Sequence, residues 1–468
     1  MSRVLGDVTL AIREDNWLQL TEGLARSEES AWVMGARLAN GVEPVRSRAT
    51  LFVRDVMPVP DEAYELRTSN RLIIQSRGWL PAFARVDRDG SIPLFAHTHP
   101  CAEPKYSPLD RIVDDELANL ASARNQREEY GSLVIGGSVD QPIFAGRFYH
   151  PDIGWQEIRR IRVVGKQLRI ITSWATRTEA GEADARIFDR QVRAFGPDGQ
   201  AVLKRLRVGI VGAGGTGSAV AEQLLRLGVG EIIVIDGQLL DRSNVTRVYG
   251  SQLENAGTSK AEIVFNNAAK VGLGTTVRPY QSKVTALTAA ERLAHCDVVF
   301  GCTDDHAGRA VLTRMPAALL QILIDCGVKL DSKDGNLKGI YGRVSVVDPG
   351  GPCLMCHGDV DPARIRDETM SADELALRQQ QGYAPELDIP DPAVITYTTM
   401  TAALAVNELL GRLFGFAAET NHLLLLAHDR RISRQRRERV GRHRCGDQSK
   451  LASGLQTPFL DWSWGTEK

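Results

Sequence analysis

The chain has 468 residues, which is long enough for about two to four ordinary domains. Its 57 basic and 58 acidic residues balance, so its overall charge gives no reason to expect nucleic acid or an anionic membrane as a partner. Seven cysteines are few for this length and odd in number, which argues against a disulfide scaffold and favours the reducing cytosol.

No segment has the pattern of a signal peptide or a membrane span. Arg13, Glu14 and Asp15 interrupt the first apolar segment. The strongest late apolar run, residues 423–427, is far too short to cross a bilayer. We therefore expect a cytoplasmic protein without a membrane partner.

The first third of the chain predicts a domain of helices and strands over residues 1–173. Apolar residues at helical spacing predict a helix within residues 8–26, and the apolar run at 31–34 predicts a strand. Further apolar segments follow at 49–56, 71–74 and 93–96, and the last of them runs directly into His97 and His99.

This histidine pair indicates a zinc site. Two histidines at i and i+2 on an extended strand project to the same side, and Asp110, expected at a helix start, can complete a set of three protein ligands. A catalytic zinc needs the remaining position for water. A separate carboxylate must accept the proton of that water. Glu28 is the natural candidate, and the adjacent Glu29 stays an alternative.

The segment from His97 to Asp110 resembles the HxHP and SxxD pattern of the JAMM metalloproteases, also called JAB or MPN. The resemblance implies an MPN/JAB α+β domain that cleaves isopeptide or peptide bonds after the C-termini of ubiquitin-like proteins. It also implies His97, His99 and Asp110 as zinc ligands, Glu28 as general base and Ser107 as a hydrogen-bond donor to the oxyanion. Two surface histidines near a proline-rich loop are the alternative interpretation.

Residues 174–186 are polar and acidic with small side chains, which predicts a linker to a second domain over residues 187–450. That domain contains a strand–turn–helix–strand unit over residues 207–247. Its glycines Gly212, Gly214 and Gly217 allow a tight turn and bring backbone N–H groups close to a phosphate, and Asp236 can accept ribose hydroxyls. The unit predicts nucleotide binding, although small residues at a turn also occur for packing alone.

The residues that follow this unit favour a triphosphate over a nicotinamide cofactor. Asn244, Arg247 and Lys260 supply polar and cationic groups, and Asp304 and Asp305 end a strand where ligands of open α/β sheets bind. Cationic side chains can neutralise the polyphosphate, and a carboxylate can hold magnesium beside the leaving pyrophosphate. We therefore expect ATP and Mg²⁺ as cofactors.

Four short elements carry a second resemblance: GxGGxG at 212–217, SNxxR at 243–247, GxxK at 257–260 and CTD at 302–304. They resemble the ThiF/MoeB and ubiquitin-activating-enzyme superfamily, over about residues 188–445. The resemblance implies a Rossmann-like domain with a mainly parallel, doubly wound sheet that adenylates the C-terminal glycine of a ubiquitin-like or sulfur-carrier protein. The residues expected to bind the cofactor are Gly212, Gly214, Gly215, Gly217, Asp236, Ser243, Asn244, Arg247, Lys260, Asp304 and Asp305.

Within this resemblance, Gly215 and Asp236 contact the adenosine half. Asn244, Arg247 and Lys260 contact the phosphates, and Asp304 holds magnesium.

Residues 188–191 resemble the N-terminal element of the family whose arginine reaches into the partner subunit's active site. The resemblance therefore implies a homodimer in which Arg190 acts in trans. One departure is Gln238, where many relatives carry a second aspartate, and the contact expected there stays open.

Cys353 and Cys356 form a CxxC pair after a predicted strand, which is typical of half a structural zinc site. His443 and Cys445 are the candidates for the other half, because Arg442 stands where a second CxxC pair would need a cysteine. We expect a site of three cysteines and one histidine. Two ordinary buried cysteines are the alternative.

Residues 359–392 predict a crossover loop that contains no cysteine. Activating enzymes that form their own thioester usually carry the nucleophile there or on an inserted domain. Cys296, Cys302 and Cys326 adjoin apolar strands and are interpreted as packing residues. The sequence thus favours adenylation and direct transfer to a partner's nucleophile, and thioester formation on this chain stays open.

Apolar residues at helical spacing over 393–416 predict a helix packed against the sheet. Eight arginines over residues 429–444 favour a solvated face over nucleic-acid binding, because the rest of the chain is not basic. Residues 451–468 form an aromatic C-terminal tail with no predicted role.

The two resemblances together predict one chain with two active sites for the same protein tail. One adenylates the C-terminal glycine of a ubiquitin-like protein, and the other, a zinc-dependent isopeptidase, trims or deconjugates it. A conjugating-enzyme-like protein is the expected further partner, in a prokaryotic pathway for which anti-phage defence is one setting. The alternative is activation and processing of a sulfur carrier for cofactor or amino-acid biosynthesis. A third interpretation is a nucleotide-sensing scaffold without activity.

Overall fold

The computed structural model describes residues 6–41, 48–124, 128–179, 186–370, 374, 392–416, 420–440, 445 and 448–455. The chain divides into two compact units. The first unit comprises Met1–Ala185, Ala318–Leu320 and Ser449–Thr457, and the second comprises Arg186–Ala317, Gln321–Gln448 and Pro458–Lys468. Residues 456–468 of the predicted C-terminal tail lie outside the described part.

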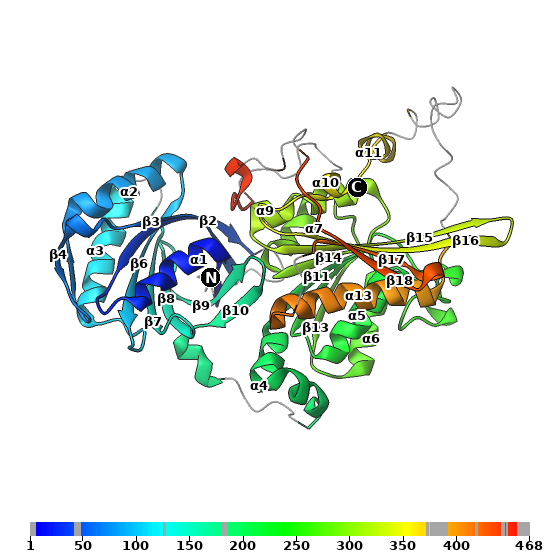
Figure 1. The fold of residues 1–468 in the computed structure, drawn as a ribbon, viewed down its shortest axis with the longest axis horizontal. Coiled ribbons are helices and arrows are strands. Elements are labelled where there is room, and N and C mark those ends of the chain that lie inside the picture. The colour runs from blue at the N-terminus through cyan, green and yellow to red at the C-terminus, as the bar shows by residue number, and fades with distance from the viewer. Residues whose placement is uncertain are drawn as a thin grey trace. The chain divides into compact units, whose positions relative to one another are not determined.

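An eight-stranded sheet forms the first unit, in the order β1-β3-β2-β6-β7-β8-β9-β10, and β9 also pairs with β1 (Figure 1). This second pairing closes the sheet on itself. Its strands are β1 (Asp7–Arg13), β2 (Ala31–Asn40), β3 (Arg48–Pro58), β6 (Ile92–Pro100), β7 (Tyr130–Gly137), β8 (Pro142–His150), β9 (Gly154–Val164) and β10 (Leu168–Thr172). A small separate sheet pairs β4 (Tyr64–Arg67) with β5 (Leu72–Ile74).

Three α-helices accompany this sheet: α1 (Glu14–Thr21), α2 (Ser76–Asp89) and α3 (Pro108–Arg124). Because side chains alternate along a strand, each face of the sheet has its own core. Met34 of β2 belongs to the core that contains Trp17 of α1. Its neighbour Val33 belongs to the core that contains Phe83 of α2 and Leu117 of α3. The two cores therefore lie on opposite faces of β2.

The prediction of a helix within residues 8–26 is wrong up to Arg13, because these residues form strand β1. The helix α1 begins only at Glu14. Val8, Leu10 and Ile12 are fully buried, and their spacing of two residues fits a strand as well as a helix. Parallel pairing of β1 with both β3 and β9 decides the outcome, because it satisfies the backbone on both sides.

The second unit contains another eight-stranded sheet, in the order β13-β12-β11-β14-β15-β16-β17-β18. Pairing is parallel from β13 to β15 and antiparallel from β15 to β18. The strand order reverses at β11, which pairs with β12 on one side and with β14 on the other. The strands are β11 (Arg207–Val211), β12 (Glu231–Ile235), β13 (Thr276–Tyr280), β14 (Val298–Gly301), β15 (Ile322–Lys333), β16 (Asn336–Val347), β17 (His422–Leu426) and β18 (Arg431–Gln435).

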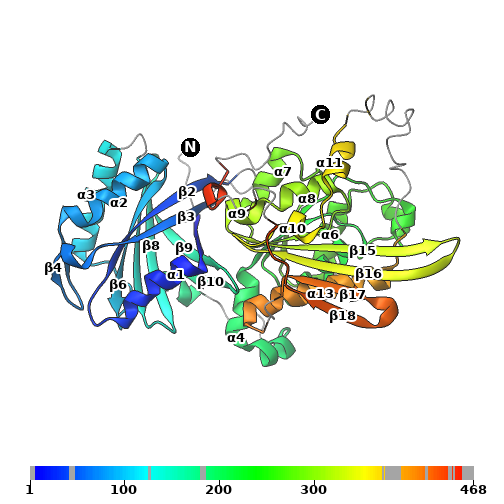
Figure 2. The same cartoon turned by 45° about the horizontal axis from the view of Figure 1, so that its top comes forward.

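Helices cover both faces of this sheet, with α5 and α13 on one side and α7 and α9 on the other (Figures 1 and 2). The α-helices are α4 (Asp189–Arg205), α5 (Gly215–Leu227), α6 (Lys260–Val271), α7 (Leu287–Arg292), α8 (His306–Leu312), α9 (Met315–Leu319), α10 (Leu354–His357), α11 (Pro362–Glu368) and α13 (Ile395–Phe414). The mixed α/β, Rossmann-like class expected from the sequence is confirmed, but the sheet is parallel only from β13 to β15 and antiparallel beyond it. Among the described residues, no helix combines the length and apolarity needed to cross a membrane.

Candidate functional site

The glycine turn follows β11, at the point where the strand order reverses. Gly212 has φ +87°, a left-handed conformation that favours glycine. A Cβ on Gly217 would lie 1.8 Å from the carbonyl oxygen of Gly212, whereas a Cβ on Gly214 would meet no atom within 4 Å. Gly212 and Gly217 are therefore required for the turn itself. Gly214 faces open space at the start of α5, where backbone N–H groups can bind an anion.

Asp236 ends β12 and lies beside this turn. Its Oδ2 accepts a hydrogen bond from the backbone N–H of Ala213 at 2.6 Å, and its Oδ1 accepts one from the N–H of Gln238 at 2.7 Å. Burial raises the pKa of Asp236, and the two hydrogen bonds oppose that rise. The carboxylate is thus fixed next to the glycine turn, as a ribose contact requires.

Cationic groups stand near the same strand ends. The Nζ of Lys260, on the first residue of α6, donates to the Oε1 of Gln238 at 2.6 Å. Arg247 donates to the backbone oxygen of Ser243 at 3.1 Å. The Cδ of Arg247 lies 3.4 Å from where a Cβ on Gly215 would stand, so this side chain passes close to the start of α5. Gln238, the departure noted in the sequence, therefore holds Lys260 through a neutral amide.

Asn244 has a local structural role in the described residues. Its Oδ1 accepts from the backbone N–H of Asp241 at 3.2 Å, and Asp241 in turn accepts from Ser243 at 2.8 Å. This capping box fixes the short 3₁₀ turn Arg242–Asn244 that carries the SNxxR element.

Asp304 and Asp305 follow β14 but differ in their surroundings. Asp305 caps α8: its Oδ2 accepts from the N–H of Gly308 at 2.6 Å, and its Oδ1 accepts from the hydroxyl of Thr303. Asp304 is exposed. Apart from burial, Lys260 lowers and Asp304 raises the pKa of Asp236, so both charges lie near that carboxylate. Asp304 is the acid left available for a cation, whereas Asp305 is used by the helix.

Arg190 lies in the first turn of α4 and is exposed. Phe188, two residues earlier, is buried. A buried anchor next to an exposed arginine fits the expectation that Arg190 acts outside its own subunit, which stays a prediction.

In the first unit, the described residues bring the expected histidines and aspartate together. The Nε2 atoms of His97 and His99 lie 3.1 Å apart, and the Nε2 of His97 lies 3.7 Å from the Oδ1 of Asp110. Ligand atoms at about 2.0–2.1 Å from a tetrahedral zinc lie roughly 3.3 Å from one another, so these residues fit the ion. One atom from each of the three lies within 4.8 Å of the others.

Ser107 and Asp110 bond to each other at the start of α3. The N–H of Ser107 donates to the Oδ2 of Asp110 at 2.6 Å, and the N–H of Asp110 donates to the Oγ of Ser107 at 3.1 Å. The Oδ1 of Asp110 consequently faces His97, and the hydroxyl of Ser107 keeps its proton for another acceptor.

Glu29, and not Glu28, lies beside the histidine pair. The Oε1 of Glu29 is 3.6 Å from the Nε2 of His99, and its side chain is 6% exposed. The side chain of Glu28 is 53% exposed and lies 3.9 Å from the guanidinium of Arg67. The placement of Glu28 in the site is thus a one-residue error, and Glu29, the alternative left open, has the required position.

Strand register explains this placement. Ala31 of β2 pairs with His97 of β6, and the backbones of Ser30 and Thr98 stay hydrogen bonded, at 2.9 Å. Because faces alternate, Glu29 shares a face with Ala31, His97 and His99, and Glu28 points the other way. The signal was present in the sequence, but using it requires the pairing of two strands that are far apart in the chain.

The two buried groups of this site have shifted pKa values. Burial, with a smaller contribution from Asp110, raises the pKa of Glu29 to about 7. Burial lowers the pKa of His97 to about 4, against the opposing effect of Asp110. His97 is therefore neutral at neutral pH, as a metal ligand must be, and Glu29 exchanges a proton readily there.

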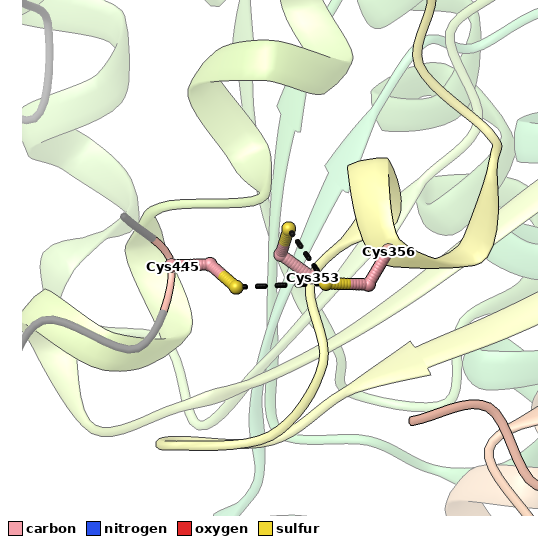
Figure 3. A group of neighbouring side chains, drawn as sticks. All are labelled: Cys353, Cys356 and Cys445. Atoms are coloured by element: carbon pink, nitrogen blue, oxygen red, sulfur yellow. Dashed lines mark hydrogen bonds between the residues drawn. The ribbon is translucent and has the colours of Figure 1, made fainter. Parts of the chain in front are cut away.

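Three cysteines meet in the second unit (Figure 3). The Sγ of Cys356 lies 3.9 Å from that of Cys353 and 3.5 Å from that of Cys445. Burial raises the pKa of Cys353 to about 12, so without an ion this group stays a neutral thiol. The spacing of the three thiols fits zinc, and His443, the expected fourth ligand, lies outside the described residues.

The remaining described thiols of this unit do not resemble a nucleophile. A hydrogen bond with Cys326, together with burial, raises the pKa of Cys302 well above its usual value. Cys296 and Cys326 are buried. A nucleophilic cysteine needs an accessible thiolate, so the packing interpretation of these three agrees with their surroundings.

The comparisons with known proteins find relatives of the second unit. The family model described as ThiF family matches residues 188–446. The chain is 30% identical over 178 residues to SAMP-activating enzyme E1 of Haloferax volcanii, covering 37% of this chain and 63% of that protein. It is 30% identical over 179 residues to adenylyltransferase and sulfurtransferase uba4 of Aspergillus terreus, covering 37% of each. The chain thus spans less than two thirds of the length of either relative.

Among solved structures, that of E. coli MccB with ATP is similar at 18% identity and a TM-score of 0.43, over 56% of this chain and 74% of that one. The family match lies in the second unit and begins after the residues that resemble a metalloprotease. Because it covers more than half of the 468 residues, this chain belongs to the ThiF family.

Proposed function

We propose that the second unit is an ATP-dependent adenylyltransferase that activates the C-terminal carboxylate of a small carrier protein ending in glycine. One observation carries the proposal: an open glycine turn, Lys260 and Asp304 gather at the carboxyl ends of adjacent parallel strands. The names of the relatives, an activating enzyme and an adenylyltransferase, support it.

In the proposed reaction, a carboxylate oxygen of the carrier attacks the α-phosphorus of ATP. A new oxygen–phosphorus bond forms, the bond from the α-phosphorus to the bridging oxygen breaks, and pyrophosphate leaves with the electron pair. The N–H groups at the start of α5 orient the phosphates, and Arg247 and Lys260 stabilise the growing negative charge. Asp304 would hold magnesium, which when bound supplies positive charge beside the pyrophosphate.

The fate of the activated carrier has two candidates. The ubiquitin-like conjugation pathway is the first expectation from the sequence, with a conjugating-enzyme-like protein as acceptor. The relatives named adenylyltransferase and sulfurtransferase support the sulfur-carrier alternative better. We therefore propose a sulfur carrier as the preferred substrate class, and supply of each acceptor to the activated carrier distinguishes the two.

Exchange of radiolabelled pyrophosphate into ATP tests the adenylation itself. We expect exchange that depends on a purified small protein ending in glycine, and that falls to background in Asp304→Ala. Asp331→Ala is the matched control, because Asp331 is an exposed aspartate away from the glycine turn. Exchange that persists in Asp304→Ala would remove this residue from the reaction.

The proposal includes a homodimer with Arg190 acting in trans. Arg190→Ala and Asp304→Ala should each lack exchange activity. Because a mixed dimer holds one site in which both residues are intact, mixing the two inactive proteins should restore part of the activity. Two variants that stay inactive when mixed, despite subunit exchange, would place Arg190 in its own subunit's site.

We propose a second activity for the first unit, and a separate cluster of side chains supports it. The cluster of His97, His99, Asp110 and Glu29 in the first unit supports a zinc-dependent peptidase or isopeptidase acting on the same carrier. The histidines and Asp110 would hold zinc, which when bound supplies Lewis-acid polarisation and acidifies water. Glu29 is placed to accept a proton from water and return it to the leaving amine. The hydroxyl of Ser107 can donate to the oxyanion.

Cleavage of a carrier with a C-terminal extension tests this activity. We expect His97→Ala to lose both one zinc equivalent and the cleavage. His150→Ala is the control, because His150 lies on β8 outside the cluster. Unchanged cleavage in His97→Ala would reject the zinc assignment, and it would leave the adenylation proposal untouched.

A further inference from the structure

A third group of metal-binding side chains lies in the second unit, and neither proposed activity uses it. It consists of His357, the last residue of α10, Asp359, two residues further, and His422, the first residue of β17. One ligand atom from each lies within 4.8 Å of the others. His357 directly follows Cys356, so α10 contributes to two neighbouring clusters.

The distances suit a small cation. The Nδ1 atoms of His357 and His422 lie 3.5 Å apart, close to the roughly 3.3 Å between ligand atoms around a tetrahedral zinc. The hydroxyl of Ser345 lies between the others: it is 3.0 Å from the Nδ1 of His422 and donates to the Oδ2 of Asp359 at 2.6 Å.

The hydrogen-bonding capacity of His357 is largely unused. Its Nε2 is buried without a hydrogen-bond partner among the described residues, and its Nδ1 has only the long contact to His422. A buried polar group without a partner destabilises the folded state. The Nδ1 faces the second histidine at 3.5 Å, so it is the atom that can bind a cation, and the partnerless Nε2 does not by itself indicate one.

Arg343 opposes a cation here, because its guanidinium lies 2.5 Å from the Oδ2 of Asp359. The same guanidinium lies 2.6 Å from the Oδ2 of buried Asp325, so its charge is shared between two carboxylates. A carboxylate has two oxygens, and the one that faces Arg343 need not bind the ion. Arginine as a neighbour of a ligating carboxylate can also fix its orientation.

We propose that His357, Asp359 and His422 form a second, buried zinc site in this unit, beside the three-cysteine cluster. Two imidazoles and a carboxylate are ligands that zinc prefers. Ser345, which donates to Asp359 and accepts from Arg343 at 2.9 Å, orients that carboxylate and is not counted as a ligand. Because all four residues are buried or nearly so, the ion would be structural. It would link α10 to the antiparallel strands β16 and β17 of the second unit.

Zinc counting in the full chain tests this site separately from the other two. The His97→Ala variant lacks the first unit's site, and a mercurial thiol reagent then releases zinc held by the cysteines. We expect one zinc equivalent to remain by mass spectrometry. It should be lost when His422→Asn is added, and it should remain in the control His428→Ala, a residue just beyond β17.

Cobalt substitution gives a second measurement on an intact site. Cobalt bound by two nitrogens and oxygen absorbs in the visible without the ultraviolet thiolate band of a cysteine site. Subtracting the spectrum of Asp359→Asn from that of the wild type should leave such a band. A chain with no zinc after thiol treatment, or with zinc unchanged by His422→Asn, overturns the proposal, and a difference spectrum without a visible band does so independently.

Discussion

Two alanine substitutions in the glycine turn should separate folding from nucleotide binding. A Cβ on Gly217 would lie 1.8 Å from the Gly212 carbonyl oxygen, and both atoms belong to the backbone, so no side chain can move to relieve the overlap. Overpacking costs about 1–3 kcal/mol, and we expect Gly217→Ala at the upper end. For a unit of this size, about 3 kcal/mol lowers the unfolding temperature by roughly 6–12 °C.

Gly214→Ala should instead fold normally. Gly214 has φ −73°, which alanine adopts readily, and its Cβ would meet no atom within 4 Å. Because glycine is preferred over alanine at a helix N-cap, this replacement lowers stability by up to about 1 kcal/mol. In the proposed site, however, the phosphates of ATP occupy the space in front of Gly214, and the Cβ of an alanine would displace them. Loss of a charge-assisted hydrogen bond costs about 1.5–3 kcal/mol, which weakens ATP binding roughly 10–150-fold.

Thermal unfolding with and without magnesium ATP measures both effects. At a ligand concentration of 100 Kd, the wild type gains about 2.7 kcal/mol, whereas a variant with 100-fold weaker binding gains only about 0.4 kcal/mol. Gly214→Ala should therefore lie within about 1 kcal/mol of the wild type without ATP and fall further behind it with ATP. Equal stabilisation by ATP would mean that this turn does not bind the phosphates, and an unchanged unfolding temperature in Gly217→Ala would refute the steric argument.

Three further substitutions test separate parts of the account. Glu29→Gln should slow carrier cleavage by roughly 10²–10⁴-fold without loss of zinc, because a general base contributes that factor, and Glu28→Gln should cleave like the wild type. Lys260→Ala should lower kcat/KM of pyrophosphate exchange by roughly 10–150-fold, whereas Lys270→Ala on the same helix should not; equal effects would exclude a specific phosphate contact. Cys445→Ser should release one zinc equivalent and lower the unfolding temperature of the second unit, and full retention of zinc would reject Cys445 as a ligand.

The grouping of the candidate nucleotide-binding residues could be predicted because these residues follow predicted strands. Gly212 and Gly217 come directly after β11, and Asp236 ends β12. In a parallel sheet these ends meet at one edge, so a linear motif already defines the geometry. The exception is Asp305, whose capping of α8 depends on where that helix begins.

Other features needed information that a single sequence does not contain. Choosing between Glu28 and Glu29 depends on the register of β2 against β6. The grouping of His357 with His422 depends on antiparallel pairing of β16 with β17, which brings distant segments together. The apolar spacing of β1 fits a helix as well as a strand, and the two parallel neighbours that decide for the strand are far away in the chain.

Transfer of AMP to a carrier protein tests the central proposal most directly. ATP labelled at the α-phosphate should pass its label to a small protein ending in glycine, among those encoded beside this chain. The same carrier with an amidated C-terminus should take up none, because it lacks the attacking carboxylate. Asp304→Ala should abolish transfer to the carrier with a free C-terminus. Equal labelling of the free and amidated carriers would contradict activation of the terminal carboxylate.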